Sequence, residues 1–544
     1  MRTFGTQGPV NPDDNYIVSR SKETADFIQR IKNGKYIVIF APRQTGKTTF
    51  FQRALDTLTT EEQHYFPIQL NFEEAEDDTA ADFYRGLYED ILEQIENVFE
   101  RRCEMPSAPL ADFLENNNRI TDHRSMRRFF RQFAKLLSRD APNPVQTASL
   151  AQRVVLLIDE FDGIPRDVLK GFLHSLRHIY VAGKPRSPHS IGIVGVKNIR
   201  QLNYDDSISP FNIQDEFVVP NFTREQVGEL LAQYTEEVGQ PFAPEVIETL
   251  HKQTAGQPFL VNRAAQILTQ ELGVPKTETI MLAHFAKAHT QLLEEGNTNI
   301  SHLLTNIRRD PRFENVLMRI TSYERGLRFN PDDEIIAELA MYGIIAKSAN
   351  GMCEIVNPIY QHRILQAFKP LFNGLEDEYF SEENGDDFID YLTPEGVIEM
   401  GALLDNFQAF IARAGFRILQ VPDTPQEYVG QHLLYAYLDT FVRIVRGDMF
   451  LEVQTGRGRM DLLLLHNQRK YIVETKIWEG DRSYQAGKQQ LSVYLKLEGV
   501  TEGYYVVFDH RQKPESRVET QTVEGVSIRS YVIPVIQVAP STTP

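Results

Sequence analysis

The chain has 544 residues, of which 42% are hydrophobic and 24% charged, and its formal net charge is −18. This length predicts about three to four domains, and the composition excludes a disordered or fibrous chain. The sequence contains no apolar run long enough for a membrane span and no apolar core of a signal peptide near its start, so we expect no membrane segment. Two cysteines are too few for a disulfide framework, and we therefore expect a cytoplasmic protein.

The negative charge is concentrated before residue 395. Residues 395–544 hold 16 Lys and Arg against 18 Asp and Glu, a balance of −2, which leaves −16 for residues 1–394. Eight acidic residues and no basic one lie between Glu376 and Asp390, a pattern typical of a solvated linker. This balance excludes a nucleic-acid-binding coat over the whole surface, but it leaves room for a local basic groove.

A phosphate-binding loop is predicted near the N-terminus. The apolar run 36–40 is typical of a buried strand, and a helical stretch follows the loop after it. The loop consists of Ala41, Pro42, Arg43, Gln44, Thr45, Gly46, Lys47, Thr48 and Thr49. Backbone N–H groups of such loops hold phosphate, so we expect Lys47 at the β- and γ-phosphates of ATP and Thr48 at Mg²⁺. The alternative is an unrelated glycine turn.

Further apolar runs at 68–72, 154–158 and 190–196 predict three more strands, separated by helical stretches. This alternation is typical of a mostly parallel sheet with helices on both faces. The second of these runs ends in Asp159 and Glu160. We expect Asp159 to give the metal a second anchor and Glu160 to act as the general base that polarises water. A strand that simply ends in acidic surface residues is the alternative.

The region after the predicted sheet is mostly helical. Residues 222–272 read as helices, with Thr223 as an N-cap and a breaker at Gly256–Pro258. Residues 343–346 and 353–356 predict a short hairpin, because Asn350-Gly351 between them is a strong turn pair.

Together these motifs resemble those of AAA-like ATPases related to the STAND class, over roughly residues 10–370. The matching motifs are Tyr16-Ile17-Val18 with Arg20, the loop 41–48, Leu157 to Asp162, Ser209-Pro210-Phe211-Asn212 and Gly256-Gln257-Pro258. The resemblance implies an ATPase core, a helical lid and a winged-helix-like module. It also implies that Pro258 lies near the base or ribose and that Asn198 senses the γ-phosphate. An oligomer, or a partner protein acting as a trigger, is a further expectation, while Arg177, Arg200 and Arg224 remain alternatives for an arginine finger.

Two carboxylates and an ammonium group are predicted to meet in the C-terminal part. The runs 451–465 and 471–478 predict two antiparallel strands, with Asp461 on the first and Glu474 and Lys476 on the second. Side chains alternate along a strand, so Glu474 and Lys476 share a face, and the hairpin can bring Asp461 opposite them. Asp461, Glu474 and the Thr475 carbonyl would bind Mg²⁺, and Lys476 would orient the attacking water. A surface salt bridge is the alternative, but it does not explain the apolar runs.

Two helices add residues to this set. Glu427 and Gln431 lie one turn apart on a helix predicted at 426–444, and Gln490 and Tyr494 are also four residues apart on a later helix. The pieces resemble the PD-(D/E)XK nuclease superfamily over about 395–535, with Met460 in place of the proline of the name. The resemblance implies a restriction-endonuclease-like α/β fold in which Glu427 and Gln490 assist the catalytic Asp461, Glu474 and Lys476.

The sequence does not assign a catalytic role to the other notable residues near this site. Arg457 and Arg459 fit a phosphate contact and a solvated turn equally well. Trp478 is better explained by core filling than by base stacking, and His432 by packing than by catalysis. The histidines lack the spacing of zinc ligands.

The sequence therefore predicts a multidomain α/β chain: a P-loop NTPase with a parallel sheet, a helical lid and winged-helix-like module, and a restriction-endonuclease-like domain. The expected boundaries are 1–220 for the ATPase core, 221–297 for the lid, 298–372 for the winged-helix-like module, 373–394 for the acidic linker and 395–544 for the nuclease-like domain. The expected function is an ATP-hydrolysing switch that controls Mg²⁺-dependent cleavage of DNA, single- or double-stranded, in defence against foreign DNA. The alternative is a nucleotide-driven signalling or binding module with a non-catalytic docking domain, which the acidic balance and the lack of a dense basic stripe favour.

Overall fold

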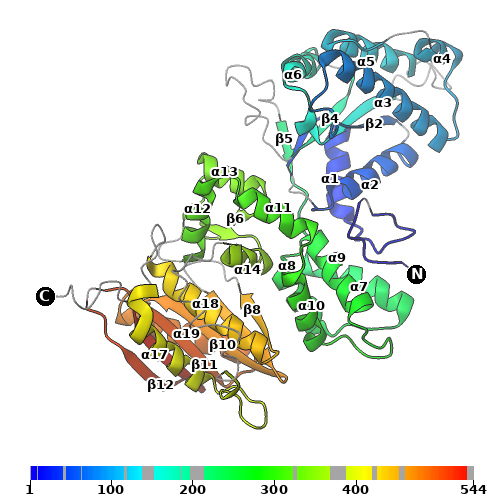
Figure 1. Cartoon of the computed structure of the whole chain (residues 1–544). Helices are drawn as coiled ribbons and strands as arrows, with labels where there is room; N and C mark the ends of the chain where they lie inside the picture. Colours follow the sequence, from blue (N-terminus) through cyan, green and yellow to red (C-terminus); the bar gives the residue numbers. More distant parts are fainter. Residues whose placement is uncertain are drawn as a thin grey trace. The chain divides into compact units, whose positions relative to one another are not determined.

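A computed structural model describes the chain with several gaps. The described residues are 2–8, 10–40, 44–62, 64–115, 119–137, 152–183, 186–195, 214–322, 327–367, 388–418, 426–452, 460–511 and 513–535. Within these ranges the side chains of residues 40, 214, 298, 322, 413–418, 426–429, 452, 460 and 461 are outside the description. The chain forms two compact units: an N-terminal unit, Gln7–Asn221, and a C-terminal unit, Phe222–Pro544 together with Met1–Thr6 (Figure 1).

The N-terminal unit is built on a parallel five-stranded sheet in the order β2-β3-β4-β1-β5. Its strands are β1 Tyr36–Phe40, β2 Tyr65–Asn71, β3 Arg153–Asp159, β4 Ser190–Gly195 and β5 Gln214–Phe217. The predicted parallel sheet is confirmed, although the strand predicted to start at residue 68 already begins at Tyr65. Both faces of the sheet are buried, which is why its strands read as continuous apolar runs.

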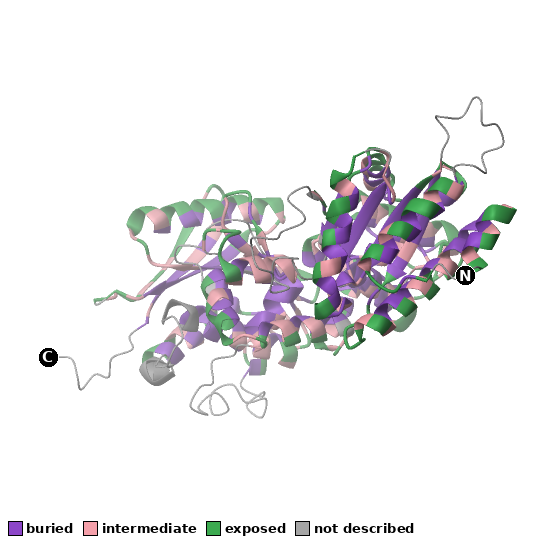
Figure 2. Ribbon diagram, turned by 90° about the horizontal axis from the view of Figure 1, so that it is seen from above, coloured by how far each residue is buried: buried purple, intermediate pink, exposed green. Residues whose placement is uncertain are grey.

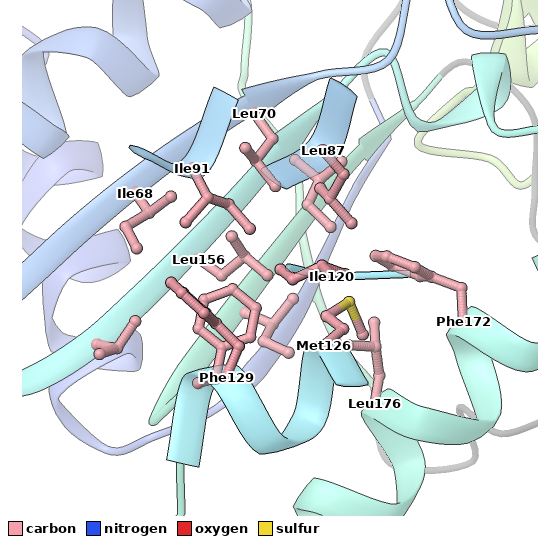
Figure 3. Packing of buried hydrophobic residues seen from close by; sticks show 14 of the residues in the cluster. Ile68, Leu70, Leu87, Ile91, Ile120, Met126, Phe129, Leu156, Phe172 and Leu176 are labelled. Atoms are coloured by element: carbon pink, nitrogen blue, oxygen red, sulfur yellow. The ribbon is translucent and has the colours of Figure 1, made fainter. Parts of the chain in front are cut away.

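Helices cover both faces of this sheet. They are α1 Ser21–Lys32, α2 Lys47–Thr60, α3 Ala80–Arg101, α4 Ala108–Glu115, α5 His123–Leu137 and α6 Arg166–Val181, with a short 3₁₀ turn, η1, at Phe161–Gly163. Alternate residues of β1 face opposite ways: Ile37 and Ile39 pack with α1 and α2, whereas Tyr36 and Val38 belong to the cluster under α3 to α6. Figure 3 shows this second cluster, in which Phe129 of α5 lies beside Leu156 of β3.

The C-terminal unit begins with helices. They are α7 Arg224–Val238, α8 Pro244–Thr254, α9 Pro258–Gln266, a π-helical turn η4 at Ile267–Glu271, α10 Leu282–Glu294, α11 Thr298–Ile307, α12 Pro311–Ser322, α13 Glu334–Met341 and α14 Pro358–Ala367. The predicted cap is confirmed, because Thr223 and Gln226 form a capping box at the start of α7.

The predicted break before α9 is also present, at Gly256. This residue has a φ of +66°, and a side-chain carbon there would lie 1.9 Å from the backbone oxygen of Phe222. Only glycine fits such a close approach of two backbones. Gln257 then caps α9, and Pro258 occupies its first turn.

The predicted hairpin is present as β6 Ile345–Lys347 and β7 Cys353–Ile355, which pair antiparallel. Gly351 in its turn has a φ of +77°, which the asparagine–glycine pair anticipates.

A second sheet forms the C-terminal part of this unit. Its six strands run in the order β12-β13-β11-β10-β9-β8 and include parallel and antiparallel pairs. They are β8 Asp448–Glu452, β9 Met460–His466, β10 Arg469–Ile477, β11 Glu502–Asp509, β12 Arg517–Val523 and β13 Val526–Pro534, accompanied by α17 Met400–Ile418, α18 Gln426–Ile444 and α19 Asp481–Leu497. The sheet is therefore mixed. Its strands β10, β11 and β13 are largely buried, whereas the edge strand β12 is mostly exposed; Figure 2 colours buried residues purple and exposed ones green.

Helices α18 and α19 cover opposite faces of this sheet. Gln431 of α18 donates a hydrogen bond to the hydroxyl of Thr475, whereas Lys476, next along β10, donates to Gln490 of α19. Neighbouring residues of a strand face opposite ways, so the Glu474 and Lys476 face is the one that α19 covers.

The edge strand β8 packs against helices of the same unit. The ring of Phe450 stacks on Phe285 of α10 with centroids 6.1 Å apart, and it lies 4.7 Å from the ring of His289. The side chain of Gln253 in α8 donates to the backbone oxygen of Leu451 over 3.2 Å. These contacts cover an edge that would otherwise expose unpaired backbone groups.

A residue from just before α17 packs against α18, one of the helices that cover the C-terminal sheet. Phe388 is 6% exposed and packs on the rings of Tyr437 and Phe441 in α18. The remainder of the predicted linker up to residue 387 lies outside the described residues. Among the helices described, none is long and apolar enough to cross a membrane.

His289, in the contact between α10 and β8, predicts that the free energy of unfolding falls at acid pH. Burial lowers the pKa of His289 to about 3, below its ordinary value of 6.5, so the folded chain holds this ring neutral. Unfolding lets the ring take up a proton, and stability is therefore complete above about pH 6.5 and falls by up to about 1.4 kcal/mol per pH unit as the pH drops toward 3.

We expect His289→Phe to reduce the fall in unfolding temperature between pH 7 and pH 4.5, measured by calorimetry. Replacement of the exposed His178 by glutamine is the matched control and should leave the pH dependence as it is in the wild type. An unchanged pH dependence in His289→Phe would show that other groups cause the acid sensitivity.

Candidate functional site

The phosphate-loop residues lie at the carboxyl end of β1. Ala41, Pro42 and Arg43 are outside the described residues. Gln44 and Gly46 have φ values of 61° and 78°, and Gly46 is the N-cap residue of α2. The first backbone N–H groups of a helix point out of its end, where they can bind an anion.

Lys47 lies inside the site. Its side chain is 6% exposed, and its Nζ is 3.3 Å from a carboxylate oxygen of Glu160. Glu160 directly follows β3 and has a φ of 45°, a left-handed conformation that is uncommon for a residue with a side chain. The loop and the end of β3 therefore meet through an ion pair.

Thr48 and Asp159 form a second contact between α2 and β3. The Thr48 hydroxyl donates to one Asp159 oxygen over 3.4 Å, and the Glu160 N–H donates to the other over 3.0 Å. Burial raises the pKa of Asp159, while the charge of Lys47 opposes that rise. A hydroxyl and a buried carboxylate side by side are suited to hold Mg²⁺ with the phosphates of a nucleotide, and the metal would neutralise the phosphate charge.

The structure describes only some of the other predicted nucleotide residues. Thr45 is buried, and the hydroxyl of Thr49 accepts the backbone N–H of Val10 over 3.1 Å, so it holds the N-terminal segment. Asn198 is outside the described residues. Pro258 belongs to the C-terminal unit, where it is buried in the first turn of α9.

The second candidate site lies on the hairpin of β9 and β10. The register pairs Asp461 with Glu474 and Met460 with Thr475. Directly opposed positions of an antiparallel pair share a face of the sheet, so the positions 461, 474 and 476 lie on one face. Glu474 is 2% exposed, and its carboxylate is 3.9 Å from the Nζ of Lys476.

The contacts of β10 differ on its two faces. Lys476 also donates to the Gln490 side chain over 3.3 Å, which brings two predicted catalytic residues together. The Thr475 hydroxyl faces Gln431 on the opposite side, so only the carbonyl of Thr475 remains as the ligand that the sequence predicts. The side chains of Asp461 and Glu427 are outside the description, as are Arg457 and Arg459.

The described side chains contain no group of three or more His, Cys, Asp or Glu placed to hold a metal ion. The described part of the hairpin site thus contributes one buried carboxylate and one ammonium group, and its metal binding stays a prediction. Acidic and amide oxygens are nonetheless the ligand types that Mg²⁺ prefers.

Trp478 directly follows β10, and the sequence predicts core filling for it. Its ring is half-buried and has two guanidinium groups over it, that of Arg511 at 4.8 Å and that of Arg517 at 5.6 Å from the centroid. Sequence reasoning assigned no role to either arginine. A bidentate pair with the fully buried Asp509 fixes Arg511. The three residues come from separate segments of the chain, so the cluster leaves no local signal in the sequence.

Comparison with known families assigns most of the chain. Residues 5–364 match the family described as the AAA-like domain, and residues 399–512 match a domain of unknown function, DUF8371. Among curated proteins none matches the sequence.

Solved structures resemble the chain at low identity. A Walker-type ATPase of Pyrococcus abyssi is 14% identical, covers 66% of this chain and 99% of its own, and has a TM-score of 0.46. The Orc1 protein of Aeropyrum pernix, solved with DNA, is 13% identical, covers 67% of this chain and 94% of its own, and has a TM-score of 0.29. The RuvB Holliday junction branch migration motor of Thermotoga maritima is 15% identical, covers 63% and 92%, and has a TM-score of 0.31.

The family match covers the sheet with the phosphate loop, the helices after it and the hairpin β6–β7. It agrees with the geometry of Lys47, Thr48 and Asp159, which is that of an ATP-binding P-loop ATPase module. The chain therefore belongs to the family of AAA-like domains.

Proposed function

We propose that the chain is an ATP-controlled, Mg²⁺-dependent nuclease that cleaves DNA. The N-terminal unit would bind and hydrolyse ATP, and the hairpin β9–β10 would carry the nuclease centre. The observation that carries the proposal is the register of this hairpin, which sets Asp461 opposite Glu474 with Lys476 on the same face.

In the ATPase half, Lys47 has two alternative partners. It pairs with Glu160, and the β- and γ-phosphates of ATP would compete for the same ammonium group. Transfer of Lys47 to the phosphates would release the Glu160 carboxylate to accept a proton from the attacking water. Thr48 and Asp159 would hold Mg²⁺ beside the phosphates.

In the nuclease half, Asp461, Glu474 and the Thr475 carbonyl would hold Mg²⁺, which would polarise the scissile phosphodiester as a Lewis acid. The side chain of Lys476 is 21% exposed, so its ammonium group can reach both the buried Glu474 carboxylate and the solvent. It would orient the attacking water and stabilise the negative charge of the transition state, and Gln490 would hold its ammonium group in place.

A contact within the C-terminal unit supports control of the nuclease by the helices α8 and α10. Gln253 holds the carbonyl of Leu451 on β8. Leu451 is paired with Leu462 of β9, and the next pair along joins Glu452 to Asp461. A shift of α8 would therefore act on the strand pair that positions Asp461.

We further propose a cytoplasmic, defence-related setting for this activity, with a STAND-like assembly or a partner protein as the trigger. The support is the combination, in one chain, of an AAA-like domain with the domain for which we propose nuclease activity. This combination suits a nuclease that must stay inactive until a trigger activates it.

Glu160→Gln should retain ATP binding but lower ATP hydrolysis by about 100-fold or more, because the amide cannot accept the proton of water. Lys47→Ala should lose ATP binding itself, and the exposed Glu73→Gln is the control that should hydrolyse ATP normally. Binding of a fluorescent ATP analogue and release of phosphate measure the two steps. Normal turnover in Glu160→Gln would assign the base to another residue.

Lys476→Ala should lower Mg²⁺-dependent DNA cleavage by about 100-fold or more, because a charge that stabilises the transition state is removed. Lys470→Ala is the matched control on the same strand, since Lys470 pairs with Glu498 away from the site. Linear, nicked, circular and single-stranded DNA, and an RNA substrate, would be incubated with Mg²⁺, with and without ATP.

Absence of cleavage of every substrate by the wild type would contradict the nuclease proposal. Metal titration calorimetry then tests the docking alternative: if Glu474→Gln and Asp461→Asn bind Mg²⁺ or Mn²⁺ with wild-type heat, the C-terminal domain has no metal centre.

Gln253→Ala should weaken the effect of ATP on DNA cleavage while leaving ATP hydrolysis near the wild-type rate. The substitution leaves the buried carbonyl of Leu451 without this donor, at a cost of about 1–3 kcal/mol to the contact between α8 and β8. Gln291→Ala is the control, because Gln291 bonds to Glu271 within the helices and not to the sheet. Equal ATP effects in the wild type and in Gln253→Ala would place the control elsewhere.

A further inference from the structure

Helix α5 carries a row of basic residues on its exposed face. Arg124, Arg128, Arg131 and Lys135 recur every three or four residues and are exposed, and Arg127 beside them is half-buried. The helix has no acidic residue. We call Arg124, Arg127, Arg128, Arg131 and Lys135 the basic stripe. The expectation that the sequence has no dense basic stripe is therefore wrong.

The opposite face of α5 is fixed in the core. Phe130 and Phe133 are fully buried, and Met126 and Phe129 are 1% and 3% exposed (Figure 3). An amphipathic helix that binds a membrane must expose its apolar face, and α5 has none to expose. The helix therefore presents its charges from a rigid support.

The charges of the basic stripe are not neutralised by neighbouring side chains. Within the described residues none of its members forms an ion pair, and the one hydrogen bond to a carboxylate is that of the Arg124 backbone N–H with Asp122. Like charges one turn apart destabilise a helix, and a positive charge in the first turn also opposes the helix dipole. Such a row is locally unfavourable unless an anion binds it.

The adjacent helix extends the positive surface. The Ser175 hydroxyl of α6 donates to the backbone oxygen of His123, which ties α6 to the start of α5. Lys170 and Arg177 of α6 are exposed, and Asp167 is the one acidic residue of that helix. Exposed basic residues thus outnumber exposed acidic residues on these two helices, in a chain whose net charge is −18.

We propose that the basic stripe binds the phosphodiester backbone of a nucleic acid and so gives the ATPase unit its own contact with DNA. From Arg124 to Lys135 the row spans roughly 16 Å at the rise of an α-helix, enough for several consecutive phosphates. Arginine supplies most of the charge, and its planar guanidinium binds phosphate through two hydrogen bonds. No base-reading group is needed, so the contact is independent of sequence.

This contact is separate from the proposed nuclease centre, which belongs to the other unit. The inference requires that the chain binds nucleic acid, but it does not require cleavage. Removal of the basic stripe should therefore weaken DNA binding even where cleavage is never observed.

The test compares two full-length variants from which the same amount of charge is removed. In the stripe variant, Arg124, Arg128, Arg131 and Lys135 are replaced by glutamine. In the control variant, glutamine replaces four exposed residues that are scattered along the chain and form no ion pair in the described part: Lys22, Lys252, Arg308 and Arg319. Binding of a fluorescent DNA duplex and of a single strand is measured by anisotropy across a range of salt concentrations, with circular dichroism to verify folding.

We expect the stripe variant to bind DNA at least about tenfold more weakly at low salt. The slope of log K against log salt should fall by about 0.9 for each phosphate that the variant no longer neutralises. The control variant should bind with nearly wild-type affinity and slope.

Wild-type affinity in the stripe variant, or equally weakened binding in both variants, would overturn the proposal. Competition by polyglutamate as effective as that by DNA would also overturn it, because an acidic protein would then be the better partner. Weakened duplex binding by the stripe variant, together with nearly wild-type binding by the control variant, supports the inference whatever the outcome of the cleavage assay.

Discussion

The register of β9 against β10 is the constraint on which the C-terminal site depends. Side chains alternate along a strand, so a slip of one residue would turn Asp461 to the face opposite Glu474. The register is held by apolar pairs further along the hairpin, where Leu462 and Leu463 face Val473 and Ile472, all nearly or fully buried. The polar end of the hairpin is therefore positioned by the free energy of burying its apolar end, and the carboxylates need not contribute to folding.

Burial of apolar side chains also explains why the edge strand β8 is covered by helices. Phe450 is 1% exposed because Phe285 and His289 of α10 cover it. Burial of this ring joins the helices of the AAA-like region to the sheet of the C-terminal domain more firmly than a solvated linker would. The thermodynamic cost is a histidine held neutral and a half-buried Asp448. Desolvation raises the pKa of Asp448, and a hydrogen bond from Thr290 opposes the rise.

Sequence patterns within a few residues predicted the elements whose formation depends on interactions between near neighbours in the chain. The buried strands, the capping box at Thr223 and the turn at Gly256 follow from side-chain type and backbone strain within a few residues. The opposed positions 461 and 474 followed from alternation and hairpin length. The covering of β8 by α8 and α10 was not predictable in this way, because the two partners are about 160 to 200 residues apart and nothing in either segment identifies the other. The basic stripe, by contrast, was available from the sequence as five basic residues on a helix of period 3.6, but the net charge of the whole chain obscured it.

The N-terminal segment shows how a residue of the nucleotide site can take a second role. Thr49 belongs to the phosphate loop by sequence, yet its hydroxyl holds Val10, which no motif indicates. The same segment is anchored a few residues earlier, where Phe4 packs on Tyr234 of α7. Thr49 directly follows the proposed Mg²⁺ ligand Thr48, so a change in the backbone there on nucleotide binding would also act on this short segment.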